Sequence, residues 1–209
     1  MRYLTFNPIR GHRRGVPSMK HPIDMHVDPV MRFFTPELYV RFNSSDDEVA
    51  DLANDEWEIA IESYQKHLDQ IRDRLPSHVR NVSELCLRDA EVLTFQKEIQ
   101  VPAALFDASR SGPAWSVMAM LGLKQGDAIW TLLYFLADRV REYPAPADWP
   151  FAKQKKHWLY DEIDLAPGFP HVYLHRVLYS DGSVAEIPFG SVIAMSMPLH
   201  EATAHKSVG

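Results

Sequence analysis

The sequence predicts an α+β protein, with N-terminal helices packed on a C-terminal antiparallel sheet whose strands mostly form a meander. Three observations indicate this class. Apolar residues recur at steps of three and four between residues 45 and 75, as they do on one face of a helix. From residue 89 the apolar spacing becomes that of short strands separated by turns. Asp181-Gly182 then marks a tight hairpin turn between two such strands.

The chain divides into a basic extension, one domain and a short tail. Residues 1–30 carry several arginines and prolines but no sustained apolar period. They predict a flexible segment, which is either an arm that touches an acidic partner or sequence upstream of a true start at Met31. One α+β domain is expected over residues 31–199, followed by a flexible tail over residues 200–209.

The helix expected over residues 45–75 is amphipathic, and the rest of the domain must cover its apolar side. Ser45 and Glu48 have the spacing of a capping box, in which the two residues satisfy free N–H groups of the first turn. Pro76 ends the helix, because it has no N–H group and its ring clashes with the preceding turn. The apolar stripe consists of Val49, Leu52, Ala53, Trp57, Ala60, Tyr64, Leu68, Ile71 and Leu75.

Shorter elements flank this helix. Residues 31–34 fit a short edge strand, and Thr35 followed by Pro36 marks a helix start. That helix should end near Phe42. A second short helix is expected over residues 77–85.

The apolar spacing in the second half of the domain predicts strands. Residues 129–140 fit either a central strand, apolar on both faces, or a helix capped by Asp127 and stopped by Pro144. The strand and tight turn before them favour the strand. The other strands are expected over residues 90–97, 115–123, 157–165, 171–180, 184–189 and 192–197.

A two-residue type I′ turn at Asp181-Gly182 fixes the register of the last hairpin. One face of this hairpin is then apolar and is assigned to the core, against the long helix; it carries Val172, Leu174, Leu178, Ala185 and Ile187. His175 and Glu186 share the other face as diagonal neighbours, with Glu162 beside them if its strand pairs alongside. These residues form the best assembled polar set in the chain, either a ligand or metal site or a cross-strand pair on a solvated face.

Composition excludes several classes of protein. The net charge of −6 argues against a nucleic-acid binder, since phosphate contacts need clustered Lys and Arg. The longest apolar run, residues 128–137, is about half the length of a membrane-spanning helix. A single cysteine, Cys86, and the lack of a secretory signal fit a cytoplasmic protein. No glycine-rich phosphate loop, nucleophile elbow or metal-ligand spacing occurs, so no catalytic, cofactor-binding or metal-binding residue is predicted.

Several short segments together resemble an uncharacterised bacterial family. The segments are MRFFTPELY at residues 31–39, LRDAEVL at residues 87–93, WLYDEI at residues 158–163, HRVLYSDG at residues 175–182 and EIPF at residues 186–189. The family begins near the equivalent of Met31 and more often has His at the position of Arg88. The resemblance covers most of residues 31–192. It implies strands in the second half and a start at Met31, and it implies no activity or functional residue.

The acidic side of the long helix carries the main functional hypothesis. Asp51, Asp55, Glu58 and Glu62 lie opposite the apolar stripe at spacings of four, three and four. They form either an ordinary solvated face or an acidic docking surface. We expect a non-enzymatic protein that binds a basic protein partner, as an immunity protein binds a basic toxin. The alternative is a hydrolase, or a protein that binds a small molecule or metal, that uses the face of His175 and Glu186.

Overall fold

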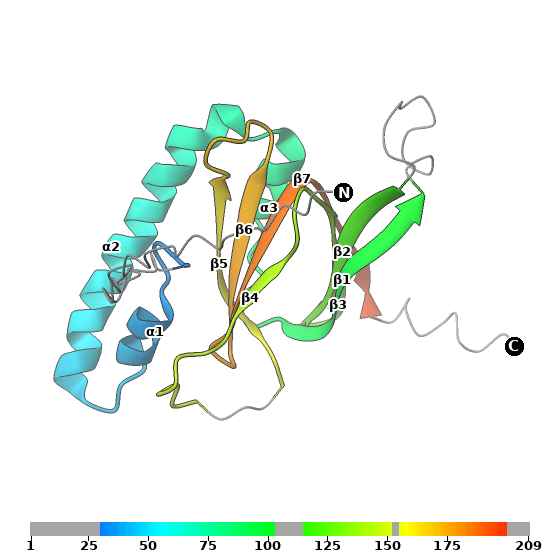
Figure 1. Cartoon of the computed structure of the whole chain (residues 1–209). Helices are drawn as coiled ribbons and strands as arrows, with labels where there is room; N and C mark the ends of the chain where they lie inside the picture. Colours follow the sequence, from blue (N-terminus) through cyan, green and yellow to red (C-terminus); the bar gives the residue numbers. More distant parts are fainter. Residues whose placement is uncertain (1–29, 103–114, 152–154, 200–209) are drawn as a thin grey trace, which may run out of the picture.

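The computed structural model describes residues 30–102, 115–151 and 155–199. Over these residues helices come first and an antiparallel seven-stranded sheet follows, which confirms the predicted α+β class (Figure 1). Flexible ends were expected at residues 1–30 and 200–209, and all of these residues except Val30 lie outside the described part of the chain. No helix of the described part is long and apolar enough to cross a membrane.

Three helices precede the sheet. They are α1 (Pro36–Phe42), α2 (Asp47–Ile71), which continues into a 3₁₀ turn over Arg72–Arg74, and α3 (Ser77–Ser83). α2 begins later than predicted, because the Asp46 carboxylate accepts hydrogen bonds from the N–H groups of Glu48 and Val49. The predicted capping box of Ser45 and Glu48 is therefore wrong.

The strands follow the predicted order with three differences, one of which is an additional short strand over Arg141–Tyr143. They are β1 (Glu91–Pro102), β2 (Trp115–Gln125), β3 (Ala128–Leu136), β4 (Arg141–Tyr143), β5 (Trp158–Leu165), β6 (Tyr173–Tyr179) and β7 (Val184–Pro198). The ambiguous segment after Asp127 is a strand, as favoured. The two strands expected after residue 183 are one continuous strand, β7. Residues 31–34 form a series of bends, so the predicted edge strand is wrong.

The sheet curls until its two ends meet. Its strand order is β1-β2-β3-β7-β6-β5, with β4 paired to the start of β7. Trp158 donates to the carbonyl of Ala90 at 2.9 Å, and Asp89 donates to the carbonyl of Trp158 at 2.8 Å. These bonds join the starts of β1 and β5. The inside of the curl holds the main core, to which Leu75 and α3 also contribute.

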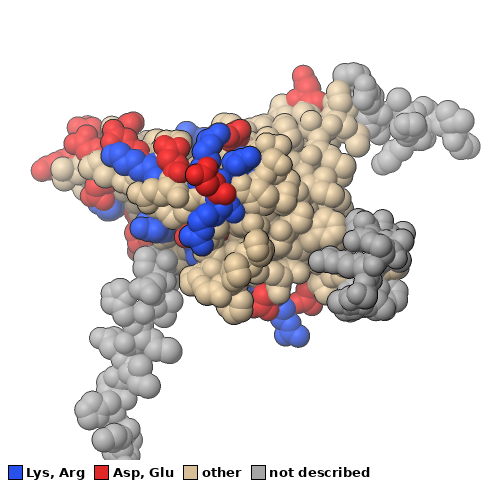
Figure 2. Space-filling view, turned by 90° about the horizontal axis from the view of Figure 1, so that it is seen from above, with Lys and Arg blue, Asp and Glu red and all other residues tan. Residues whose placement is uncertain are grey.

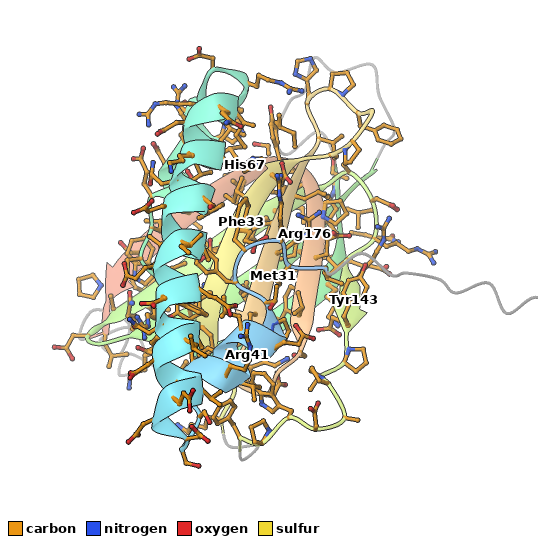
Figure 3. All side chains as sticks on the ribbon, turned by 90° about the vertical axis from the view of Figure 1, so that its left-hand side faces the viewer. Met31, Phe33, Arg41, His67, Tyr143 and Arg176 are labelled. Carbon is orange, nitrogen blue, oxygen red and sulfur yellow. The ribbon has the colours of Figure 1, made fainter. Side chains whose placement is uncertain are left out.

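A second core fastens α2 to the outer side of β5 (Figures 1 and 3). Trp57 is 4% exposed and lies edge-on to the ring of Tyr160 on β5, with ring centroids 4.4 Å apart. Phe34 and Phe42 also pack on Trp57. The buried stripe is narrower than predicted, since Leu52 is 60% exposed.

The last hairpin has a register one residue away from the predicted one. Gly182 donates to the carbonyl of Tyr179 at 2.8 Å and has a φ of 78°, which makes a type I turn followed by a left-handed glycine. Asp181 stabilises this turn, because its carboxylate accepts from the N–H and hydroxyl of Ser183. Arg176 therefore pairs with Glu186.

This shift reverses the relative faces of the two strands, as a one-residue slip must. Leu178 and Val184 face the helices together. Ala185 and Ile187, which had been assigned to the same face as Leu178, instead lie in the core inside the curl.

Trp57→Ala is expected to lower the free energy of unfolding by about 3–5 kcal/mol, because the change removes buried apolar surface and leaves a cavity. Asp55→Ala, on the exposed side of the same helix, should change it by less than about 0.5 kcal/mol. Urea unfolding of the two variants measures both values. A larger loss for Asp55→Ala would show that the buried side of α2 is misassigned.

Candidate functional site

A row of charged side chains crosses four neighbouring strands on the face that the helices cover. This charged row consists of Glu162 on β5, Arg176 on β6, Glu186 on β7 and Arg141 on β4. Each residue is the direct cross-strand partner of the next, so all four side chains lie on one face of the sheet. The sequence analysis placed Glu162 and Glu186 on one face, whereas it missed Arg176, which lies between them, and Arg141, which lies beyond Glu186.

Glu186 is the centre of the charged row. Its carboxylate accepts from Arg176 Nε at 2.9 Å and from Arg141 Nη1 at 3.1 Å, and its side chain is 8% exposed. Glu186 raises the pKa of the Arg141 guanidinium above its usual value. Removing either arginine would weaken the compensation of a nearly buried charge, which is costly.

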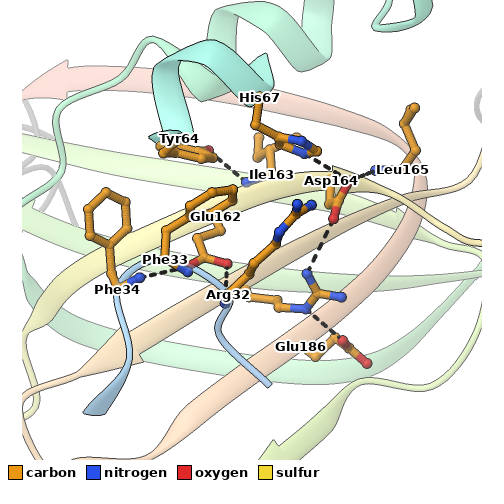
Figure 4. Close-up of polar contacts among 11 residues, drawn as sticks. Arg32, Phe33, Phe34, Tyr64, His67, Glu162, Ile163, Asp164, Leu165 and Glu186 are labelled. Carbon is orange, nitrogen blue, oxygen red and sulfur yellow. Dashed lines mark hydrogen bonds and ion pairs between the residues drawn. The ribbon is translucent and has the colours of Figure 1, made fainter. Parts of the chain in front are cut away.

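Glu162 binds the segment that precedes α1 (Figure 4). Its carboxylate accepts from the backbone N–H groups of Arg32, Phe33 and Phe34 at 2.9, 2.6 and 2.8 Å. The side chain is buried, and burial raises the pKa of Glu162, while the three N–H groups oppose this rise. The segment bends because its three N–H groups converge on this one carboxylate, which explains why it is not an edge strand.

Two further contacts fix α2 against β5 (Figures 3 and 4). The Tyr64 hydroxyl accepts from the backbone N–H of Ile163 at 2.7 Å, so it covers an open edge position of β5. His67 Nε2 lies 3.0 Å from a carboxylate oxygen of Asp164. Asp164 also lies 3.7 Å from Arg176 Nη1, which joins α2 to the charged row.

His175 points to the other face of the sheet, into the core, because its cross-strand partner is Ile187. The predicted diagonal pair of His175 and Glu186 is therefore wrong. His175 is fully buried between the Tyr134 hydroxyl at 2.9 Å and the Asp161 carboxylate at 3.1 Å. This buried arrangement stabilises the core and leaves no ring nitrogen open to a substrate. Within residues 30–102, 115–151 and 155–199, no three His, Cys, Asp or Glu side chains are grouped to hold a metal ion.

The acidic face of α2 lies on the surface, as predicted. Asp51, Asp55, Glu58 and Glu62 are all exposed. Glu62 lies 3.6 Å from Lys66, and the other three form no ion pair with any described residue. Figure 2 shows charged side chains gathered over the helical side of the molecule.

Apolar side chains flank this acidic face. Leu52 and Ile59 are 60% and 64% exposed. They lie two helical turns apart, so both side chains are on the same side of α2, which we call its apolar shoulder. Ile59 also lines an open depression of about 490 Å³ between α2 and the segment that runs into α1, together with Arg32, Phe33 and Leu38. Periodicity alone had assigned Leu52 to the buried stripe, and it gave no sign of the depression.

Comparison with protein-family models and with curated proteins finds no match to this chain. The candidate sites are therefore interpreted from their own geometry.

Glu162→Ala should lower the free energy of unfolding by about 3 kcal/mol or more, because three backbone N–H groups lose their acceptor in a largely buried place. The matched control is Glu84→Gln, whose exposed side chain makes only a surface ion pair, and it should change the value by less than about 0.5 kcal/mol. Urea unfolding measures the free energy of unfolding. Hydrogen exchange at the backbone amides of Phe33 and Phe34 reports directly whether these N–H groups have lost their acceptor. Unchanged exchange at these two amides would contradict the assigned role of Glu162.

Proposed function

We propose that this chain is a protein-binding module that docks a basic protein through the exposed side of α2. The observation that carries the proposal is the combination of acidic and apolar exposure on one helix. Asp51, Asp55 and Glu58 lack a cationic partner among the described residues, and Leu52 and Ile59 stand beside them. An immunity protein that neutralises a basic toxin is a concrete form of this function.

The uncompensated carboxylates support a basic partner. At about 1.5 Å per residue, the acidic face from Asp51 to Glu62 extends over roughly 16 Å, comparable with part of a protein interface. A line of like charges attracts oppositely charged surfaces and raises the rate of encounter. Such attraction weakens as salt screens the charges.

The apolar shoulder of α2 indicates that the partner is a macromolecule rather than a small cation. Large exposed aliphatic side chains such as Leu52 and Ile59 supply contact area that desolvation makes favourable. The neighbouring depression with Phe33 and Leu38 can accept an apolar side chain of the partner. Protein interfaces commonly combine such an apolar centre with a charged rim.

The binding surface is also held in place before any partner arrives. Trp57, Tyr64 and His67 fix the opposite side of α2 to β5 and to the segment before α1. A helix that is already ordered loses little conformational freedom on binding, which favours affinity. The rival function, which needed His175 and Glu186 on one face, has no corresponding site in this register.

The test is a double charge reversal, Asp55→Lys with Glu58→Lys, against a matched control at Asp127→Lys with Asp148→Lys. The wild-type chain is used to capture a basic partner from lysate, and the purified pair is then measured by calorimetry. We expect the α2 reversal to weaken binding at least about tenfold and the control to retain binding, because only α2 forms the docking surface. Affinity should also fall from about 50 mM to about 500 mM NaCl.

Two results would contradict the proposal. One is recovery of no basic partner at low salt. The other is an equal affinity for the α2 reversal and the wild-type chain. Ile59→Ser supplies an independent check, since loss of an apolar contact should mainly accelerate dissociation.

A further inference from the structure

A groove of about 370 Å³ lies beside the charged row and is lined by residues of the β5–β6 turn and of the β3–β4 connection. Its floor is the cross-strand pair of Leu174 and Pro188. Val172 and Phe169 from the β5–β6 turn also line the groove, as does Arg141 from β4. This volume is within the range of small-molecule sites.

Phe169 is placed to contact a ligand. It is 67% exposed, which is high for so large an apolar side chain, and it lines the groove. The turn that carries it has left-handed backbone at Gly168, with a φ of 77°, and at His171, with a φ of 67°. A non-glycine residue in this conformation is strained, and such strain persists only where the surrounding structure imposes it.

Arg141 gives the groove a cation that is only partly used. Its Nη1 donates to the nearly buried Glu186, its Nη2 donates to Asp138 at 3.2 Å, and its side chain also hydrogen-bonds to the side chain of Tyr143. The guanidinium has five N–H donors, so others remain for a ligand. The side chains of Arg141 and Asp138 are 55% and 62% exposed, and an ion pair so exposed contributes little net stability.

We propose that the groove binds a small carboxylic acid with an apolar or aromatic body. The ligand carboxylate replaces Asp138 on Arg141 Nη2. The apolar body lies over Leu174 and Pro188, against Phe169.

The exchange of one carboxylate for another leaves Arg141 Nη2 hydrogen-bonded to a charged acceptor, while the displaced carboxylate oxygen of Asp138 turns to solvent. Asp138 keeps the hydrogen bond that its other oxygen accepts from the N–H of Arg139 at 2.8 Å. The bond between Arg141 and Glu186 is not disturbed, so no buried charge loses its partner. Favourable binding then comes from the apolar contacts, while Arg141 selects for the negative charge.

Because the ligand and Asp138 compete for Arg141, substitutions at these two residues should change the affinity for the ligand in opposite directions. Asp138→Asn removes the competing carboxylate and should tighten binding by about two- to fivefold, the range expected for an exposed ion pair. Arg141→Gln removes the donor and should weaken binding by at least about tenfold. The control is Arg139→Gln, because Arg139 is exposed and does not line this groove, and it should leave affinity unchanged.

Titration of the isotope-labelled chain with hydrocinnamate, followed by amide chemical shifts in NMR, tests the proposal. We expect saturable shifts at the amides of Phe169, Leu174 and Ala137, which line the groove. The neutral isostere hydrocinnamamide should bind at least about tenfold more weakly, because it lacks the charge that Arg141 recognises. The spectrum of each variant without ligand shows whether it is folded.

Three results would overturn the proposal. These are the absence of saturable shifts around the groove, equal affinity for the acid and the amide, and failure of folded Asp138→Asn to bind more tightly than the wild-type chain. The first two need no substitution, so they decide the matter even if Arg141→Gln does not fold.

Discussion

The helical layer depends on the buried carboxylate of Glu162. Its three hydrogen bonds from the N–H groups of Arg32, Phe33 and Phe34 fold the segment before α1 onto β5. Phe34 thereby meets Trp57 and Tyr160, and α2 lies against the same strand. An isolated buried carboxylate would be strongly unfavourable, so the cost of burying Glu162 is offset only when this segment is in place. One side chain thus couples the order of the N-terminal segment to the position of the helix.

The parts of the fold that depend on local sequence could be predicted. The 3.6-residue period gave α2 and its acidic side, and alternation with turn residues gave the strands. The cap of α2 and the faces of the last hairpin were predicted wrongly because side chains there bind the local backbone, which a hydrophobic period does not reveal. Aspartate side chains at positions 46 and 181 capture nearby N–H groups, and each moves a boundary by one residue.

The candidate sites depended on long-range pairing that the sequence does not reveal. Glu162 and Glu186 were placed on one face, but Arg141 and Arg176 became their partners only because the strands pair in this register. A one-residue difference moved His175 from that face into the core. The groove beside Arg141 arises from two turns far apart in the chain, so no local pattern could indicate it.

The charged row and the acidic face of α2 differ in their electrostatic range, because the carboxylates of the row have cationic partners and those of α2 mostly do not. In the charged row, guanidinium groups already compensate the carboxylates, so the row produces little field beyond the molecule. On α2, Asp51, Asp55 and Glu58 have no such compensation from the described residues, and their field extends into solvent. Long-range attraction of the basic protein that we propose as a partner would therefore come from α2. The charged row would act only over contact distance, on the ligand that we propose to displace Asp138 from Arg141.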